Sequence, residues 1–270
     1  MGDDVLCSAA TAPGRRAEGT SARWLAALLL LAPFLVFVTA PPGAPWAIPP
    51  LVALSLVVTK TAPALRVHAL FFGFLAILLA AGVPWPLPFA LPVLLVVALR
   101  GRSAAVRDAT TWLRGGELDR GTLLFAACVA VVSSAALVLW FTYDDADVSD
   151  IVAMVPLSNV PTLMAIAVVF SVANAIWEEF LLKGMAWDAL TRVLSNRSLI
   201  NVAQAVLFGL MHYHGFPRGL TGVVLAAIYG FLLGVIRGRT GGMTLVVATH
   251  VIADLTICAL VFSRVGNVDG

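Results

Sequence analysis

Two adjacent glutamates and a lysine form the first group of residues whose types and spacing could do chemistry. Glu178 and Glu179 are followed by Lys183, which lies four positions after Glu179. On a helix this spacing places Glu179 and Lys183 on one face, where they can pair. Consecutive helix residues point about 100° apart, so Glu178 faces elsewhere. A carboxylate without a cationic partner suits general-base work, although both glutamates could instead lie at a solvated helix end.

Two histidines add ionisable groups within or next to apolar stretches. His212 follows Phe208 by four positions, so the two side chains lie on the same face of a helix. Asp254 follows His250 at the same spacing, so it could accept a hydrogen bond from His250 and fix its tautomer, or share a ligand with it. A histidine near a helix end is often only a polar residue at the membrane boundary, and this interpretation stays open for His212. His214 is expected in an interfacial loop.

Such a cluster supports two hydrolytic arrangements. In the first, Glu178 and His212 activate a water molecule directly, and His250 with its partner Asp254 stabilises the oxyanion. In the second, His212, His250 and a carboxylate hold a zinc ion, which lowers the pKa of bound water to about 7. The sequence contains no HExxH, GxSxG or GxGD motif, which leaves serine and aspartyl mechanisms unsupported. Direct activation by glutamate is slightly favoured.

The elements that must position these residues are predicted to be transmembrane helices. The 270 residues are 60% hydrophobic and only 12% charged, whereas soluble domains carry about 25% charged residues. Runs of about 20 apolar residues are typical of transmembrane helices. The sequence therefore predicts an all-α, polytopic transmembrane helical bundle with about eight to nine spans, because short neighbouring runs could merge. The apolar runs lie at about 24–40, 45–59, 67–83, 86–99, 122–142, 160–183, 199–213, 219–236 and 242–263.

Basic residues are distributed unevenly between the predicted loops. With nine spans and a cytoplasmic N-terminus, all lysines and arginines except Arg218 and Arg264 fall on the inside. The acidic segment 144–150, with Asp144, Asp145, Asp147 and Asp150, falls outside, as the positive-inside rule predicts. The basic segment 100–120 is predicted to be a cytoplasmic loop, with room for a short interfacial helix. The first run could be a signal peptide, but its length favours an uncleaved anchor.

The depths of these residues along their helices indicate that they can meet. Glu178 lies 17 residues before Ser195 in a polar turn, and His212 lies 17 residues after it. In an antiparallel helix pair this sets both roughly 25 Å from the turn, provided that the first helix continues to about Val193. His250 lies at a similar depth on a helix that starts from the same side. We therefore expect one shared site within the membrane.

The three motifs in order resemble a known family. The first motif is EExxx followed by a basic residue, and FxxxH and HxxxD/N follow it on successive hydrophobic helices. This combination is similar to that of the CPBP family. This family, also called Abi, groups type II CAAX prenyl proteases with bacteriocin-processing proteins. The match covers roughly residues 160–260. It implies a CPBP-like catalytic transmembrane core at 143–270. The cytoplasmic N-terminal tail at 1–23 and the N-terminal transmembrane spans at 24–142 are predicted from charge and hydropathy, and the resemblance hardly constrains them.

The resemblance also implies roles for individual residues. Glu178 matches the catalytic glutamate of the first motif, and Glu179 its partner. The further matches are His212 in the second motif, His250 and Asp254 in the last, and Lys183 and Phe208 as supporting residues. Lys183 stands where Arg is usual, which keeps the charge but loses the bidentate fork. Asp254 stands where Asn is common, and a second carboxylate would change the local charge or favour a metal.

The function implied by the resemblance is that of an intramembrane endopeptidase. It would hydrolyse membrane-associated or lipidated peptides with a water activated by glutamate and histidine. Zinc is the candidate cofactor, with His212, His250 and Glu178 as its candidate ligands. The expected partners are a peptide or lipidated-protein substrate and the lipid bilayer, without nucleic acid, and the expected location is a bacterial plasma membrane. The alternatives are a non-catalytic scaffold or immunity-type protein, and a proton-coupled transporter.

Overall fold

The computed structural model describes residues 20–39, 44–143, 149–153, 155–156 and 159–265. Every regular element in these ranges is helical. The predicted tail up to residue 19 and the acidic residues Asp144, Asp145 and Asp147 lie outside the described residues. In chain order the helices are α1 (Thr20–Thr39), α2 (Ile48–Thr61), α3 (Arg66–Ala80), α4 (Leu87–Arg100), α5 (Ala104–Ala109), α6 (Arg120–Tyr143), α7 (Ser149–Val152), α8 (Val160–Glu179), a π-helical segment (Phe180–Ala186), α9 (Trp187–Val193), α10 (Arg197–Met211), α11 (Gly219–Thr240) and α12 (Thr244–Val265), with short 3₁₀ turns at Pro45–Ala47 and Pro63–Leu65.

Helices long and apolar enough to cross a membrane number five within the described ranges. They are Pro63–Ala80, Arg120–Tyr143, Val160–Val193, Gly219–Thr240 and Thr244–Arg264. Three shorter apolar helices accompany them, at Ala27–Val38, Leu87–Arg100 and Arg197–Met211. The prediction of an all-helical membrane protein is therefore confirmed. The count of eight to nine spans stays a prediction, because the shorter helices fall below the length of about 17 residues that a span needs.

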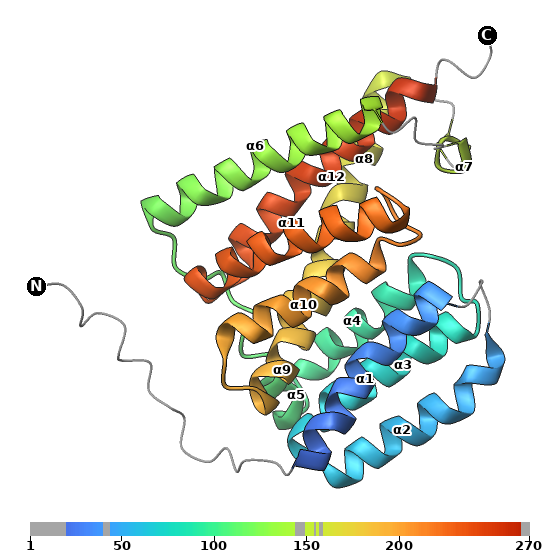
Figure 1. The fold of residues 1–270 in the computed structure, drawn as a ribbon, viewed down its shortest axis with the longest axis vertical. Coiled ribbons are helices and arrows are strands. Elements are labelled where there is room, and N and C mark those ends of the chain that lie inside the picture. Colours follow the sequence, from blue (N-terminus) through green and yellow to red (C-terminus); the bar gives the residue numbers. More distant parts are fainter. Residues whose placement is uncertain (1–19, 40–43, 144–148, 154, 157–158, 266–270) are drawn as a thin grey trace, which may run out of the picture.

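The helices pack side by side in a broad stack (Figure 1). α6 and α12 lie at one end of this stack, α1, α2 and α3 lie at the other, and α10 and α11 lie between them. α12 packs against both α8 and α6, while α10 packs against α11 and α1. The three helices that carry the motifs, α8, α10 and α12, thus form one contiguous half of the molecule together with α11.

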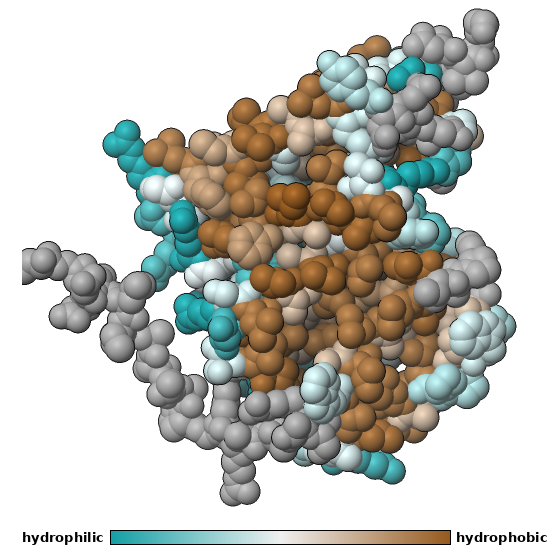
Figure 2. All heavy atoms as spheres, in the orientation of Figure 1, coloured by the Kyte–Doolittle hydropathy of each residue, from teal (hydrophilic) through white to brown (hydrophobic). Residues whose placement is uncertain are grey.

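A hydrophobic band covers the visible face of the protein. Figure 2 shows this band across the middle of the helices, with hydrophilic residues gathered towards both of their ends. Large apolar side chains such as Val131 and Val169 are exposed on the outer faces of the long helices. Helices that are apolar on all sides are typical of membrane spans. The distribution therefore fits an integral membrane protein whose band faces lipid.

The helix that carries both glutamates is longer than its apolar run predicts. Asn159 caps its start by accepting a hydrogen bond of 3.0 Å from the backbone N–H of Thr162. The helix then continues through the π-helical segment to Val193. The continuation to about Val193, on which the depth argument depends, is therefore present. Single π-helical turns occur frequently at functional sites.

The basic segment 100–120 is more than a surface loop. It contains the short helix α5, and the ring of Trp112 is buried at 4.9 Å from that of Phe180. Gly184 makes room for this ring, since a Cβ atom at position 184 would overlap Trp112. The segment also forms a backbone hydrogen bond with the end of α11, where Glu117 N–H donates to the carbonyl of Thr240 at 2.8 Å. The loop prediction is corrected accordingly.

α10 and α11 approach each other closely and carry one wall of the site. Asn196 caps α10 by accepting a hydrogen bond of 3.1 Å from Leu199 N–H. A Cβ atom at Gly230 of α11 would lie 2.8 Å from the Phe208 side chain, so only glycine permits this contact. Phe208 is thereby packed between the two helices, one turn before His212.

Candidate active site

The imidazole of His250 is surrounded by three carboxylates. Its Nδ1 atom lies 2.8 Å from Glu179 Oε1. Its Nε2 atom lies 3.5 Å from Asp254 Oδ1 and 3.8 Å from Glu178 Oε2. The structure thus brings together four of the five candidate catalytic residues of the sequence. The closest oxygen is that of Glu179 on α8, whereas Asp254, the partner expected from the spacing, lies farther from the ring.

Glu179 and Lys183 form a fully buried ion pair. Both side chains have 0% exposure, and Lys183 Nζ lies 3.5 Å from Glu179 Oε2. This distance exceeds the usual range of about 2.7–3.2 Å for an N–H···O hydrogen bond, so the attraction is mainly between the two charges. The ammonium group also lies 4.2 Å from the centroid of the Phe208 ring, a favourable cation–π position. Lys183 and Phe208 therefore both help to hold Glu179 in place.

Glu178 differs from its neighbour in the group that faces its Oε2 atom: neither Oε2 atom accepts a hydrogen bond among the described residues, but only that of Glu179 faces Lys183. Its side chain is 14% exposed. Among the described residues, no group hydrogen-bonds its Oε2 atom, although that atom is buried. Lys183 pairs with Glu179 and not with Glu178. Glu178 is thus the carboxylate of this cluster with acceptor capacity left for another molecule.

An asparagine that the sequence argument did not single out completes this side of the site. Asn174 Nδ2 donates a hydrogen bond of 3.1 Å to Asp254 Oδ2. Its Oδ1 atom accepts one of 3.0 Å from Trp177 Nε1. Asn174 lies four residues before Glu178, on the same helix face. An amide at this spacing inside an apolar run is the signal that could have identified it, because polar groups in spans are costly unless they are paired.

His212 lies at the C-terminal end of α10 and is set apart from the carboxylates. Its Nδ1 atom donates a hydrogen bond of 2.9 Å to the carbonyl of Phe208. Its ring stacks on Phe208 with centroids 4.9 Å apart, and the same Phe208 ring lies 5.7 Å from that of His250. Among the described residues, no ion pair joins His212 to a carboxylate. In a neutral imidazole this geometry leaves Nε2 as the acceptor.

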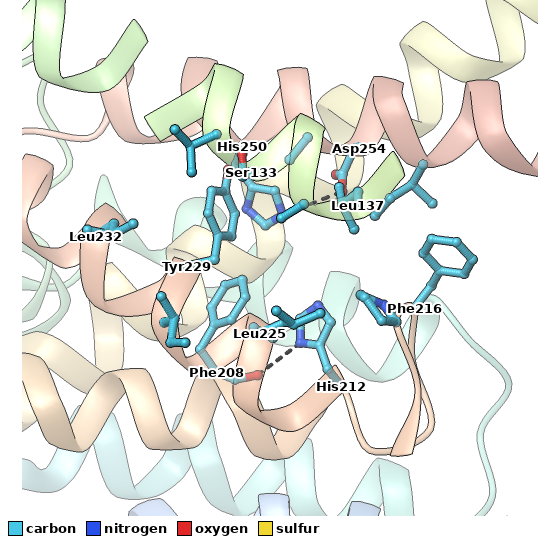
Figure 3. Close-up of a pocket in the computed structure, with 17 residues that line it drawn as sticks. Ser133, Leu137, Phe208, His212, Phe216, Leu225, Tyr229, Leu232, His250 and Asp254 are labelled. Carbon is cyan, nitrogen blue, oxygen red and sulfur yellow. Dashed lines mark hydrogen bonds and ion pairs between the residues drawn. The ribbon is translucent and has the colours of Figure 1, made fainter. Parts of the chain in front are cut away.

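A pocket of about 120 Å³ separates the two histidines. Figure 3 shows His212 on one side of it and His250 with Asp254 on the other. Tyr229 lines the same pocket, and its hydroxyl donates to the carbonyl of Thr249 at 3.2 Å. Most of the remaining lining is apolar and comes from α6 and α11. Neither Glu178 nor Glu179 is among the lining residues, so the expected convergence of all the candidates on one cavity is incomplete in this structure.

The other two histidines lie elsewhere. His214 is exposed in the turn after α10, as predicted, and its Nε2 atom donates to the carbonyl of Val38 at 3.3 Å. His68 of α3 is buried and donates from Nε2 to Asp188 Oδ2 at 2.9 Å. Arg192 binds the same oxygen at 2.8 Å. This second cluster joins α3 to α9 and contacts neither glutamate of the candidate site.

The donor atoms of this cluster do not have the arrangement that a metal ion needs. Structural and catalytic zinc sites use three or four His, Cys, Asp or Glu ligands. Within the described ranges, no group of three or more such side chains is arranged to hold a metal ion. His212, His250 and Glu178, the predicted ligands, therefore do not form a ready zinc site in this arrangement.

Comparison with known proteins gives one match. Residues 160–256 match the family model described as type II CAAX prenyl endopeptidase Rce1-like. No curated protein and no solved structure matches the chain. The matched segment runs from the start of α8 into α12 and contains every candidate site residue, whereas α1 to α6 lie outside it. The resemblance predicted from the three motifs is therefore confirmed over residues 160–256, the part of the chain that is similar to the Rce1-like type II CAAX prenyl endopeptidase family.

Proposed function

We propose that this membrane protein is an intramembrane endopeptidase of the CAAX type. It hydrolyses a peptide bond in a membrane-associated or lipidated peptide by means of a directly activated water molecule. The observation that carries the proposal is the unequal pair Glu178 and Glu179. Glu179 is paired with Lys183 and hydrogen-bonded to His250, whereas Glu178 does not pair with Lys183, and its buried Oε2 atom lies 3.8 Å from His250 Nε2 without accepting a hydrogen bond.

Glu178 is the general base in this proposal. It takes a proton from the water molecule as the water oxygen attacks the carbonyl carbon of the substrate. The tetrahedral intermediate then collapses, the C–N bond breaks, and the proton passes from Glu178 to the leaving amine. Positioned carboxylates are common general bases and contribute about 10²–10⁴-fold to the rate. His212, whose Nδ1–H is held by the Phe208 carbonyl, accepts the second hydrogen bond of the water at Nε2.

His250 stabilises the negative charge of the intermediate. Both of its nitrogen atoms face carboxylate oxygens, at 2.8 Å for Nδ1 and at 3.5 and 3.8 Å for Nε2. Such surroundings favour N–H donors on both sides of the ring, because a carboxylate only accepts hydrogen bonds. When the substrate is bound, the N–H at Nε2 donates to the developing oxyanion in place of Asp254. Donors aimed at such an oxygen contribute strongly in a site that excludes water.

The test compares two glutamate substitutions in the purified, vesicle-reconstituted protein. A panel of internally quenched apolar peptides, with and without a lipidated cysteine, measures cleavage. Glu178→Gln should lower kcat by about 10²–10⁴-fold, and His212→Ala should also abolish hydrolysis. Glu117→Gln is the matched control, because Glu117 is exposed and lies outside the site. Full activity in Glu178→Gln would refute the mechanism, and a parent protein that cleaves no peptide would favour the scaffold alternative.

A further inference from the structure

One wall of the pocket comes from a helix that the family match does not cover. Ser133, Ala136 and Leu137 of α6 line the pocket together with His212 and His250. α6 ends at Tyr143, before the matched segment begins at residue 160. The candidate reactive groups and this wall thus come from separate parts of the chain. α6 is held against α12 by a hydrogen bond of 2.9 Å between Ser134 and Thr256.

The lining of the pocket indicates what it can hold. Apart from the histidines, Asp254, Ser133 and Tyr229, the lining side chains are apolar. The cavity measures about 120 Å³. An aliphatic cavity of roughly 150 Å³ binds benzene, so a space of this size accepts one medium-sized apolar side chain. A complete prenyl or acyl chain is too large to be enclosed here.

The pocket also reaches the lipid-facing surface. Val132 of α6 and Ile228 of α11 both line it, and their side chains are 62% and 57% exposed. The opening between them lies on apolar helices that are long enough to span a membrane. A hydrophobic peptide could therefore reach the site sideways from the bilayer, without its apolar groups passing through water.

We propose that α6 is the specificity wall of this site and that the pocket binds one apolar side chain flanking the scissile bond. Ala136 and Ser133, the small residues of this wall, set the size of the side chain that is accepted. They line the same pocket as both histidines, which places the bound side chain next to the group to be hydrolysed. This inference rests on the proposed function and adds its substrate selectivity.

The experiment is a selectivity measurement on two neighbouring alanines. Ala136→Leu adds three carbon atoms to a residue that lines the pocket, whereas Ala135→Leu makes the same change at an exposed position that does not line it. Both variants and the parent protein are reconstituted in vesicles. They are given peptides that differ only in the two residues flanking the scissile bond, which are Ala, Val, Leu or Phe.

Ala136→Leu should lower kcat/KM for the Leu and Phe peptides by at least about 10-fold, since each methylene in a hydrophobic pocket changes kcat/KM by about 10–200-fold. Cleavage of the Ala peptide should persist, which shows that the variant is folded. Ala135→Leu should keep the order of preference of the parent. If the parent cleaves peptides but both variants show the same order of preference, the specificity wall is refuted while the proposed function stands. If the parent cleaves none of them, both proposals fall.

Discussion

Glu179 Oε1 accepts a hydrogen bond of 2.8 Å from His250 Nδ1, with both side chains buried between α8 and α12. The other oxygen of this carboxylate faces Lys183 at 3.5 Å. Glu179 therefore connects the buried cation to the imidazole, because each of its two oxygens faces one of these groups. This arrangement makes Glu179 a positioning residue, whereas Glu178 Oε2, among the described residues, neither accepts a hydrogen bond nor pairs with Lys183.

The two glutamates should consequently differ in what their substitution costs. In Glu179→Gln the amide oxygen can still accept from His250, but Lys183 loses its counter-charge inside the bundle. Removing one partner of a buried pair destabilises a protein by about 3–5 kcal/mol. Glu178→Gln leaves that pair intact and should cost no more than about 1 kcal/mol. Unfolding of both variants in the same detergent measures this difference, and equal losses of stability would contradict the assignment.

Two substitutions of Lys183 separate the effect of its charge on stability from the effect of its size. Lys183→Met removes the charge at similar volume and leaves Glu179 unpaired, so we expect a loss of about 3–5 kcal/mol. Lys183→Arg restores the residue usual in the family, but position 183 has 0% exposure and lies against the Phe208 ring. Overpacking of this kind costs about 1–3 kcal/mol. We expect Lys183→Arg to unfold more readily than the parent while it still cleaves substrate. A Met variant as stable as the parent would show that the ion pair contributes nothing.

The sequence predicts the helices of the site and several of its side-chain pairs. Each predicted apolar run contains a helix, because apolar composition and length are local properties. The i,i+4 spacing also predicts the contacts of Glu179 with Lys183 and of His250 with Asp254. Both follow from helix geometry alone and need no knowledge of how the helices pack.

Other features depend on tertiary packing and are not readable from spacing. The π-helical segment Phe180–Ala186 leaves no trace in hydropathy, because hydropathy does not distinguish a π-helical turn from an α-helical one. The insertion of Trp112 beside Gly184 joins segments more than 70 residues apart. The choice of Glu179 as the partner of His250 depends on the rotation of α8 against α12. Hydrophobic periodicity fixes neither the facing of two apolar helices nor their register.

The choice between direct activation and zinc can be decided on the purified protein. Direct activation predicts that cleavage survives dialysis against a metal chelator and that the active protein holds far less than one equivalent of zinc. The reason is the donor arrangement, which groups no three suitable ligands among the described residues. Cleavage that is lost with the metal and returns with one equivalent of zinc would establish the zinc alternative. Glu178→Gln measured in the same way shows whether this carboxylate contributes to metal content.

We predict that Asn174 affects activity by orienting the carboxylate of Asp254. Exchanging the two residues tests this prediction. Asn174 donates to Asp254 Oδ2 at 3.1 Å and is not among the residues that line the pocket. Asn174→Asp places two carboxylates against each other and should lower kcat by about 10-fold or more, with little change in KM. Its Oδ1 atom can still accept from Trp177, so the rest of α8 keeps its contact.

The double variant Asn174→Asp with Asp254→Asn restores one donor and one acceptor in exchanged positions. Asp254→Asn alone should fold and remain active, since the resemblance implies that Asn is common there. If the contact matters, the double variant recovers activity relative to Asn174→Asp, with a coupling energy of about 0.5–3 kcal/mol. Purely additive effects would mean that the two side chains act independently. In that case the orientation of Asp254 would be set by His250 alone, because these two are its only polar side-chain contacts among the described residues.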